Sequence, residues 1–543
     1  MTCRTPKVLA GHQHVPHMGS VMNHRSRFRL VALGVLTWAW IGAVSSNANA
    51  ETYQVGPDKP HASLNDLQDS LQPGDVVEVE GDATYPGNIH FRKHGTSEAP
   101  IIIRGIPRQG RPPVLSGGDE WTIVLHGDHY VLENFEITGG QQYCVVHKAH
   151  DITLRNVVVH DCPNHGILGT DEESGSLTIE HSEVYACGSG EKRHQLYIAT
   201  DESMHPGSVF RLQFTYVHDA NGGNNVKSRA ERNEIYYNWI EGALYHGLDL
   251  IGPDGQSPGL AREDSDVVGN VIVTTSSWQA ARFGGDATGA TAGRYRFVNN
   301  TFIMGPESKV ALRMQENVES VELHNNVFFK LGDNEMQLIR HTDPMGASPV
   351  VRGSHNWIQE GFTDIPSGLS ATVPGTNPGF ANPDTFDLRP GKGAALIDAG
   401  TSETALQDSH AMPSALEIPA FVPPYRMRLA AGTQVQRPKT GELDIGAYEQ
   451  GSPDAPKPDW STGGAAGSGG MGGLGGSGGG TGGGIGPGTK PGGSNTGDEE
   501  SSGCACGVVV KRDNAMQALL VAMGIIALRW RKNRRNEWSV PHF

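Results

Sequence analysis

Six short segments between residues 165 and 314 carry side chains that could transfer protons or bind an anionic substrate. When they are aligned as strands, the third position is apolar in every one and is predicted to face a core. Alternate residues of a strand face opposite sides, so the fourth position is predicted to face outward. The segments are HGILGT (165–170), HQLYIA (194–199), NNVKSR (224–229), HGLDLI (246–251), QAARFG (279–284) and KVALRM (309–314). Their fourth positions hold Leu168, Tyr197, Lys227, Asp249, Arg282 and Leu312.

The polar side chains in the middle of this outward row suit β-elimination from a uronic-acid polysaccharide. That reaction removes a proton next to a carboxylate. It needs a base, a cation for the developing enolate and a proton donor for the leaving oxygen. We predict Lys227 as the base, because Arg229 and Arg282 nearby would lower its pKa. The alternative role of the two arginines is to hold the substrate carboxylate. Tyr197 or His194 would donate the proton.

A second set of polar residues is predicted to surround the catalytic ones and to bind substrate. Asp249 would hold Lys227 in place or bind Ca²⁺, and the others stand at the first position of a segment or in a nearby loop or turn. Arg313 aligns at an inward position and is predicted to belong to the fold. The alternative for the whole row is a solvated ion-pair ladder that only stabilises the stack. The predicted substrate-binding residues are Asp249, His246, His165, Asn225 and Arg232.

These segments belong to a longer repeat in which Asn recurs inside strand-like stretches between Glu51 and Gln450. The steps between neighbouring positions run from 22 to 34 residues. Stacked coils hydrogen-bond in parallel at about 4.8 Å per step, and an Asn in a bend can bond its amide to the coils above and below. The pattern predicts an all-β chain folded as a right-handed parallel β-helix, a solenoid. The ladder positions are Asn134, Asn156, Asn238, Asn270, Asn300, Asn326 and Asn356, with His181 and Thr215 at the same place in two related coils.

The two ends of this body are also predicted from sequence. Residues 63–71 indicate a short N-terminal cap helix with leucines on one face, which would cover the open edge of the first coil. NPGF (377–380) and DIGAYE (444–449) resemble closing segments of secreted bacterial β-helix proteins. Residues 51–450 as a whole are similar to the pectate-lyase-like superfamily. Polysaccharide lyases of this fold use a Lys or Arg base, with or without Ca²⁺, and the resemblance implies that option here.

Three functions remain open for this body, because the fold hosts several chemistries. The favoured one is an enzyme, a lyase acting on an acidic polysaccharide. The second is a non-catalytic carbohydrate-binding or adhesive surface protein that uses the same groove. The third is a glycoside hydrolase of the polygalacturonase type, which needs clustered Asp residues, whereas the row offers only Asp249. A net charge of −16 argues against a nucleic-acid partner, and we expect a monomer.

The first 50 residues have the three parts of a signal peptide. Met22 is predicted to be the true start, and three arginines follow it before the apolar run 30–44. Residues 48–50 form a small-x-small cleavage site, so the mature chain is expected to begin at Glu51. The alternative is a membrane anchor, which is disfavoured because the run is shorter than the roughly 20 residues that a span needs.

The far end of the chain is predicted to be a linker followed by a sorting tail. Residues 451–503 are mostly Gly, Ser, Thr and Pro and cannot bury a core, so we expect a disordered tether. Residues 504–543 hold Cys504 and Cys506, then an apolar run and a basic end. This order resembles the myxobacterial C-terminal sorting signal, which implies capture at the membrane by an apolar helix and display at the cell surface. A charged triplet before the run departs from that pattern, and a plain single-pass anchor is the alternative.

Cysteines in the body predict one disulfide. Cys162 and Cys187 each lie six residues after their ladder positions in adjacent coils, which predicts Cα atoms near bonding range. We predict a bridge between these two, with buried free thiols as the alternative. Cys144 is predicted to be a small core residue.

Overall fold

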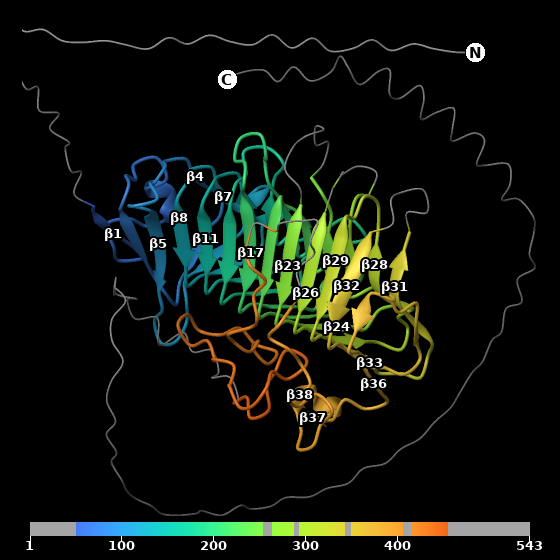
Figure 1. The fold of residues 1–543 in the computed structure, drawn as a ribbon. Coiled ribbons are helices and arrows are strands. Elements are labelled where there is room, and N and C mark those ends of the chain that lie inside the picture. Colours follow the sequence, from blue (N-terminus) through green and yellow to red (C-terminus); the bar gives the residue numbers. More distant parts are fainter. Residues whose placement is uncertain are drawn as a thin grey trace, which may run out of the picture. The chain divides into compact units, whose positions relative to one another are not determined.

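The computed structural model describes residues 50–253, 263–286, 291, 293–342, 349–404, 412 and 414–453. They form a right-handed parallel β-solenoid of about 11 turns with no α-helix among them, which confirms the predicted fold class (Figure 1). The predicted signal peptide up to residue 49, the linker from residue 454, Cys504, Cys506 and the C-terminal apolar helix lie outside the described residues. Within the described part of the chain, no helix is long and apolar enough to cross a membrane.

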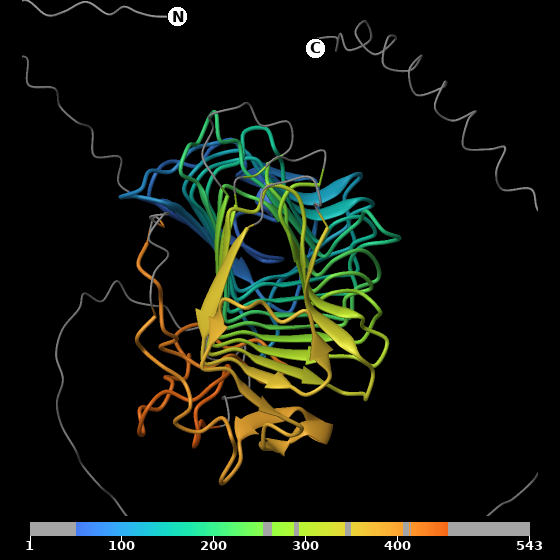
Figure 2. The ribbon, with the colours of Figure 1, turned by 45° about the vertical axis from the view of Figure 1, so that its right-hand side comes forward.

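Three parallel sheets form the sides of the coils, which stack behind one another in Figure 2. Sheet A consists of β1 (Thr52–Val55), β2 (Val76–Glu80), β5 (Ile101–Ile106), β8 (Tyr130–Glu133), β11 (Ile152–Arg155), β14 (Leu177–Glu180), β17 (Val209–Gln213), β20 (Arg232–Tyr236), β23 (Asp264–Val268), β26 (Arg294–Val298), β29 (Ser320–His324), β32 (Val350–Ser354) and β35 (Leu369–Ser370). Sheet B consists of β3 (Thr84–Pro86), β6 (Val114–Ser116), β9 (Glu136–Thr138), β12 (Val158–His160), β15 (Glu183–Tyr185), β18 (Tyr216–His218), β21 (Trp239–Glu241), β24 (Val271–Thr274), β27 (Thr301–Met304), β30 (Val327–Lys330), β33 (Trp357–Gln359) and β36 (Val373–Gly375). Sheet C consists of β4 (Ile89–Phe91), β7 (Trp121–Leu125), β10 (Tyr143–His147), β13 (Ile167–Gly169), β16 (Leu196–Ala199), β19 (Val226–Arg229), β22 (Leu248–Leu250), β25 (Ala281–Phe283), β28 (Val310–Met314), β31 (Met336–His341) and β34 (Phe362–Thr363).

The core runs along the inside of the stack and is built by alternation within each strand. In β5, for example, Ile101 and Ile103 are fully buried, whereas Ile102 and Arg104 are partly exposed. Successive side chains of a strand point to opposite faces, so each coil gives one face of its strands to the interior. On sheet C the buried positions include those predicted from the alignment, namely Ile167, Leu196, Val226, Leu248 and Ala281.

The predicted Asn ladder is confirmed from Asn238 to Asn356, but it is only one of two columns. Its five Asn side chains are fully buried, and each amide donates to the Oδ1 of the next at 3.0 Å. Thr215 extends this column, since its backbone N–H donates to Asn238 Oδ1 at 3.0 Å. The other predicted members lie one residue earlier, in left-handed backbone conformations, and their placement in the ladder is wrong. These members are Asn134, Asn156 and His181, with φ of 66°, 52° and 52°.

The N-terminal edge of sheet C is covered by the segment in which we predicted a cap helix. The structure has a single 3₁₀ helix there, η1 (Leu64–Asp66), followed by turns. Leu64, Leu67 and Leu71 are all buried in the core. The side-chain oxygen of Gln68 accepts the backbone N–H of His90 in the edge strand β4 at 2.9 Å. A side chain thus occupies a hydrogen-bonding group that an open edge would leave free.

Residues 376–453 do not continue the stack but return along the outside of sheet B. We call their described part the return segment, and it is the orange chain below the coils in Figure 1. It contains β37 (Phe380–Asn382), η2 (Pro383–Thr385) and β38 (Asp387–Pro390). Leu388, Val422 and Ile445 of this segment pack in one apolar cluster with Trp239 and Trp357 of sheet B. Both tryptophans are fully buried, so the outer face of sheet B from β18 to β33 is covered by the chain itself.

The disulfide joins Cys144 to Cys162, with Cα atoms 5.7 Å apart, and Cys187 is a buried free thiol. The predicted bridge between Cys162 and Cys187 is therefore wrong, although Cys144 is buried as predicted. The Sγ atoms of Cys144 and Cys162 lie 3.7 and 3.3 Å from the carbonyl oxygen of His160, at the same corner. Sequence spacing alone did not determine whether the coil before Cys162 or the coil after it supplies the bonded cysteine.

Candidate active site on sheet C

Strand register on sheet C brings the predicted polar side chains together. Adjacent strands pair Leu168 with Tyr197, Tyr197 with Lys227, Lys227 with Asp249, and Asp249 with Arg282. Neighbouring strands of a sheet lie about 4.8 Å apart, so the polar side chains follow one line across four coils. The predicted geometry is confirmed, and the chemical roles assigned to these residues stay predictions.

The same line continues into two arginines that the sequence alignment missed. Arg313 pairs with Arg282, and Arg340 pairs with Arg313. Leu312 is fully buried. The predictions that Leu312 faces outward and Arg313 inward are therefore wrong by one residue. Ala311 and Leu312 are both apolar, so the pattern offered two registers. The structure aligns Leu312 with the inward Ala281, and Ala311 is buried as well. We call Tyr197, Lys227, Asp249, Arg282, Arg313 and Arg340 the sheet C row.

Asp249 is a fully buried carboxylate with two partners. Arg282 donates to its oxygens from Nε at 2.5 Å and from Nη2 at 2.7 Å, and Asn224 donates from Nδ2 to Oδ2 at 2.8 Å. Burial acts to raise the pKa of Asp249, but the charge and hydrogen bonds of Arg282 outweigh burial and lower it to about 2. Asp249 is therefore ionised and orients Arg282.

These contacts also decide whether Asp249 suits Ca²⁺. Calcium takes about six to eight oxygen ligands in proteins. Both Asp249 oxygens already accept hydrogen bonds from a guanidinium cation, and Asn224 presents its NH₂ group rather than its oxygen. In the described ranges, no three His, Cys, Asp or Glu side chains are grouped as metal ligands. The donor set at Asp249 does not fit a calcium ion.

Lys227 is partly buried between Tyr197 and Asp249 in the row. Its Nζ lies 5.1 Å from the centroid of the Tyr197 ring. Burial lowers the pKa of Lys227, and Arg229 and Arg282 lower it further against the opposing effects of Asp249 and Asp286. A desolvated lysine with a depressed pKa has the properties of a general base.

Arg229, predicted to be catalytic, is buried at the end of β19. Its Nη2 pairs with Asp286 at 2.8 Å, and its Nη1 donates to the carbonyl oxygen of Gly252 at 2.9 Å. This position lets its charge act on Lys227 through space. It does not suit direct binding of a substrate carboxylate, so the predicted catalytic role becomes an electrostatic one.

The predicted histidines form a hydrogen-bonded ladder beside the row. The backbone N–H of His194 donates to His165 Nδ1 at 2.9 Å, and that of Asn224 donates to His194 Nδ1 at 3.0 Å. The ladder continues where the backbone N–H of His246 donates to Asn224 Oδ1 at 3.0 Å. A ring nitrogen that accepts a hydrogen bond carries no proton, which assigns the proton of His165 and His194 to Nε2.

Burial keeps these histidines neutral. It lowers the pKa of His165 and His246 to about 4 and that of His194 to about 3. A neutral imidazole is a poor acid at physiological pH, so His194 does not suit the role of proton donor. Of the two predicted donors, the geometry favours Tyr197, whose ring lies against His194 with centroids 5.7 Å apart.

Two predicted substrate-binding residues lie away from the row. Asn225 is fully buried, donating to the carbonyl oxygen of Glu241 at 2.7 Å and accepting from Gln195 at 2.9 Å. Arg232 belongs to β20 of sheet A and pairs with Asp266 at 2.5 Å. Their predicted place beside the row is wrong, because Asn225 points into the corner of its coil and Arg232 follows a turn onto another sheet.

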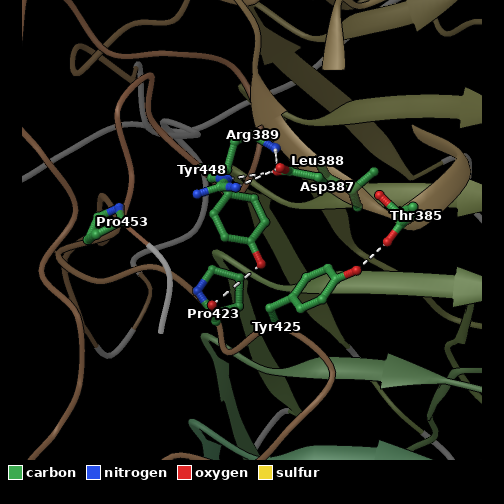
Figure 3. Close-up of a pocket in the computed structure, with 8 residues that line it drawn as sticks. All are labelled: Thr385, Asp387, Leu388, Arg389, Pro423, Tyr425, Tyr448 and Pro453. Atoms are coloured by element: carbon green, nitrogen blue, oxygen red, sulfur yellow. Dashed lines mark hydrogen bonds and ion pairs between the residues drawn. The ribbon is translucent and has the colours of Figure 1, made fainter. Parts of the chain in front are cut away.

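A well-formed pocket of about 190 Å³ lies elsewhere, within the return segment (Figure 3). Its polar side chains already form hydrogen bonds with other groups of the return segment. Arg389 binds Asp387 through Nε at 2.7 Å and Nη2 at 2.6 Å, Tyr425 donates to the carbonyl oxygen of Thr385, and Tyr448 donates to that of Pro423 at 3.4 Å. No residue of sheet C lines it. The pocket therefore offers no reactive group comparable to the sheet C row.

No protein-family model and no curated protein matches this chain. The chain is similar to solved structures of β-helix enzymes. An alginate lyase from Paenibacillus sp. str. FPU-7 is 16% identical, with 60% of this chain and 98% of that chain covered at a TM-score of 0.33. For pectate lyase Pel9A the identity is 13%, the coverage 74% and 96%, and the TM-score 0.42. A lacto-N-biosidase from Eubacterium ramulus is 14% identical, with 60% of this chain and 68% of that chain covered at a TM-score of 0.32.

Proposed function

We propose that this protein is an exported lyase that cleaves an acidic polysaccharide by β-elimination at the sheet C row. One observation carries the proposal. A partly buried lysine with a lowered pKa lies in register with a carboxylate that holds an arginine through two hydrogen bonds. This pairing supplies a base and a fixed cation on one face, which are the two parts that proton removal next to a carboxylate requires.

In the proposed reaction, neutral Lys227 removes the proton from the carbon that bears the uronate carboxylate. The electron pair left behind forms a carbon–carbon double bond to the neighbouring ring carbon. The bond from that ring carbon to the glycosidic oxygen breaks, and Tyr197 gives its phenolic proton to the departing oxygen. Lys227 ends protonated and Tyr197 deprotonated, and exchange with water restores both residues.

Arg282 stabilises the negative charge that builds up on the carboxylate in this step. Its Nε and Nη2 are committed to Asp249, whereas its Nη1 has no hydrogen-bond partner among the described residues. A guanidinium held in place before the substrate arrives needs no reorganisation as charge develops. Arg313, the next residue of the row, adds a second cation.

The disulfide between Cys144 and Cys162 supports the export part of the proposal, because disulfides persist in oxidising compartments. We extend the proposal to display at the cell surface through residues 504–543. An antibody against the solenoid should label intact producing cells. Labelling that appears only after permeabilisation contradicts surface display and leaves the enzymatic proposal standing.

The enzymatic proposal is tested with purified protein and a panel of polygalacturonate, alginate and glycosaminoglycans, each with and without Ca²⁺. We expect far-ultraviolet absorbance from an unsaturated product with at least one polymer. Binding without product would contradict the lyase and favour the non-catalytic carbohydrate-binding alternative. New reducing ends without an unsaturated product would favour a hydrolase of the polygalacturonase type.

A further inference from the structure

The sheet C row changes character along the stack. From Lys227 onward, five neighbouring coils present four cations and one carboxylate, Asp249. Toward the N-terminus, the row continues from Tyr197 into Leu168 and then into two valines of β10 and β7, without a charged side chain. A ligand lying along the row therefore meets a cationic surface at one end and an uncharged stretch at the other, where Leu168 is partly exposed and the two valines are buried.

Two cations at the C-terminal end of the row, Arg313 and Arg340, form no ion pair among the described residues. Arg313 is partly exposed, its buried Nε has no hydrogen-bond partner among the described residues, and the same range shows no ion pair for Arg340. Burial lowers the pKa of Arg313, and the charges of Arg282 and Arg340 on either side lower it further. Bringing three guanidinium groups into one line costs free energy through like-charge repulsion, and an anionic ligand would recover it.

Other polar atoms on the same coils also lack partners. They are Nδ1 of His246, Oε1 of Gln279 and Oε1 of Gln315, each buried and without a hydrogen bond in the described part of the chain. Buried polar atoms are nearly always satisfied in native proteins, so each such atom needs an explanation. A polar ligand that reaches these coils would supply the missing donors and acceptors.

The N-terminal end has the features of a site for uncharged sugar. Val124 and Val146 are buried, so the accessible groups at this end are Leu168 and the partly exposed rings of Trp121 and Tyr143. Trp121 and Tyr143 pair at the starts of β7 and β10, and the Tyr143 ring stacks on that of His165 with centroids 5.8 Å apart. Aromatic rings and apolar side chains suit the C–H faces of sugar rings rather than ionised groups.

We infer that the substrate lies along the row in one direction, with consecutive uronate residues on the coils of Arg282, Arg313 and Arg340 and uncharged sugar on those of Leu168 and Val146. This inference rests on the proposed function, because it extends the site at Lys227. It names a substrate class, an acidic polysaccharide in which a run of uronates adjoins uncharged residues. A guanidinium pairs with each carboxylate through parallel hydrogen bonds, which gives the run its register.

The test uses uronate oligosaccharides of one length in three forms. One is fully charged, and the other two have the carboxyl groups reduced to alcohols at one end or at the opposite end. Binding to the intact protein is measured by calorimetry, with cleavage recorded separately. We expect one end-reduced form to bind as tightly as the fully charged form and the other to bind at least tenfold more weakly. Equal affinities for the two end-reduced forms would overturn the inference.

A variant series assigns the cationic end. Arg313→Ala with Arg340→Ala should weaken binding of the fully charged oligosaccharide at least tenfold and flatten its salt dependence. Arg352→Ala is the matched control, since this exposed arginine lies in the neighbouring coil but on sheet A. Unchanged binding in the double variant would refute the assignment even if the protein cleaves polymer. Loss of binding in a protein that cleaves nothing would support the subsite while the lyase proposal fails.

Discussion

Two faces of this solenoid carry rows of charged residues, and only one of them is balanced. On sheet A, Arg155 lies between two carboxylates, at 3.2 Å from Glu133 and 2.6 Å from Glu180, and Arg104 binds Glu133 at 2.5 Å. Farther along the same sheet, Asp266 binds Arg296 at 2.5 Å. From Arg104 to Glu180 opposite charges therefore alternate from coil to coil, as expected for a ladder that stabilises a stack. Farther along, Glu234 and Asp266 are neighbouring carboxylates, and arginines pair with both.

The sheet C row has the same construction with a different charge pattern. Its lone carboxylate, Asp249, is fully used by Arg282 and Asn224, and Lys227, Arg313 and Arg340 have no second carboxylate in the row to balance them. This charge pattern differs from that expected if the sheet C row were only an ion-pair ladder. The sheet A ladder from Arg104 to Glu180 is neutralised by its own members. Asp286, the carboxylate that acts on Lys227 and Arg282 from outside the row, already pairs with Arg229, so the cations at Arg313 and Arg340 favour a ligand-binding role.

The largest expected difference between the two rows is catalytic. Lys227→Ala should lower kcat on the best polymer by about 10³-fold, because general-base catalysis contributes on this order. Arg155→Ala on sheet A should leave kcat within about twofold. Circular dichroism establishes that both variants are folded. If Lys227→Ala keeps its activity, another residue is the base, and the two rows do not differ in catalysis through Lys227.

The next difference is in stability and follows from burial. Asp249→Asn leaves a partly buried Arg282 without its counter-charge and should cost about 3–5 kcal/mol in the free energy of unfolding. Glu133→Gln on sheet A changes a carboxylate that is itself slightly exposed and that pairs with the one-third-exposed Arg155, and it should cost about 1 kcal/mol. Urea titrations at neutral pH measure both. Equal losses would show that the two carboxylates contribute equally to the free energy of unfolding, despite their different burial.

The acid side of this stability effect has a definite sign. The pKa of Asp249 is lowered to about 2 by folding, from about 3.9 in the unfolded chain. Its contribution is therefore complete above about pH 4 and is lost as the pH falls toward 2. The stabilities of the wild-type protein and Asp249→Asn should converge over this interval.

A smaller effect concerns the pH dependence of activity. Only the neutral form of Lys227 is a base, so kcat/KM should rise with pH as this residue loses its proton. Arg282 is one of the cations that lower the pKa of Lys227, so Arg282→Gln should move this limb of the profile to higher pH. Arg104→Gln on sheet A should leave its position unchanged. If the rising limb of the Arg282→Gln profile stays at the wild-type pH, Arg282 does not lower the pKa of Lys227.

The smallest effect concerns the balanced row alone. Arg155→Ala should lower the free energy of unfolding by at most about 1 kcal/mol at low salt, because its side chain is about one third exposed. The loss should shrink as ionic strength rises and the pairs are screened. A loss of several kcal/mol would mean that the sheet A rows hold the stack together more than exposed ion pairs normally do.

Sequence reasoning located the row most directly where a strand offered a single apolar choice. In the segments of Tyr197 and Lys227 only one register buries an apolar third residue and keeps the polar one outside. Ala280-Ala281 before Arg282 offered two registers, and the predicted one is that of the structure. The register failed at Ala311-Leu312, where two apolar residues stand side by side. The position of the Asn ladder was ambiguous for the same reason, since the pairs Asn299-Asn300 and Asn325-Asn326 each place one Asn in either of two columns.

Other features had no periodic signal to reveal them. The path of a turn decides that Arg232 reaches sheet A and that Asn225 points inward, and a turn follows from local backbone angles rather than from strand alternation. The return segment has few strands and no repeat, so its packing on sheet B could not be read from hydrophobic spacing. The partner of Cys162 depended on which coil places a second thiol at its corner.

The return segment changes how this solenoid should fold. A stack in which each coil touches only its neighbours can open from either end, one coil at a time. Here Arg428 donates to Asn156, 272 residues earlier, while other parts of the same segment pack against Trp239 and Trp357. Opening a middle coil therefore also breaks contacts with a strap that spans many coils. Folding should be slow, and the coils from Asn156 to Trp357 should unfold together, with amide exchange as well protected at the ends of this stretch as in its middle.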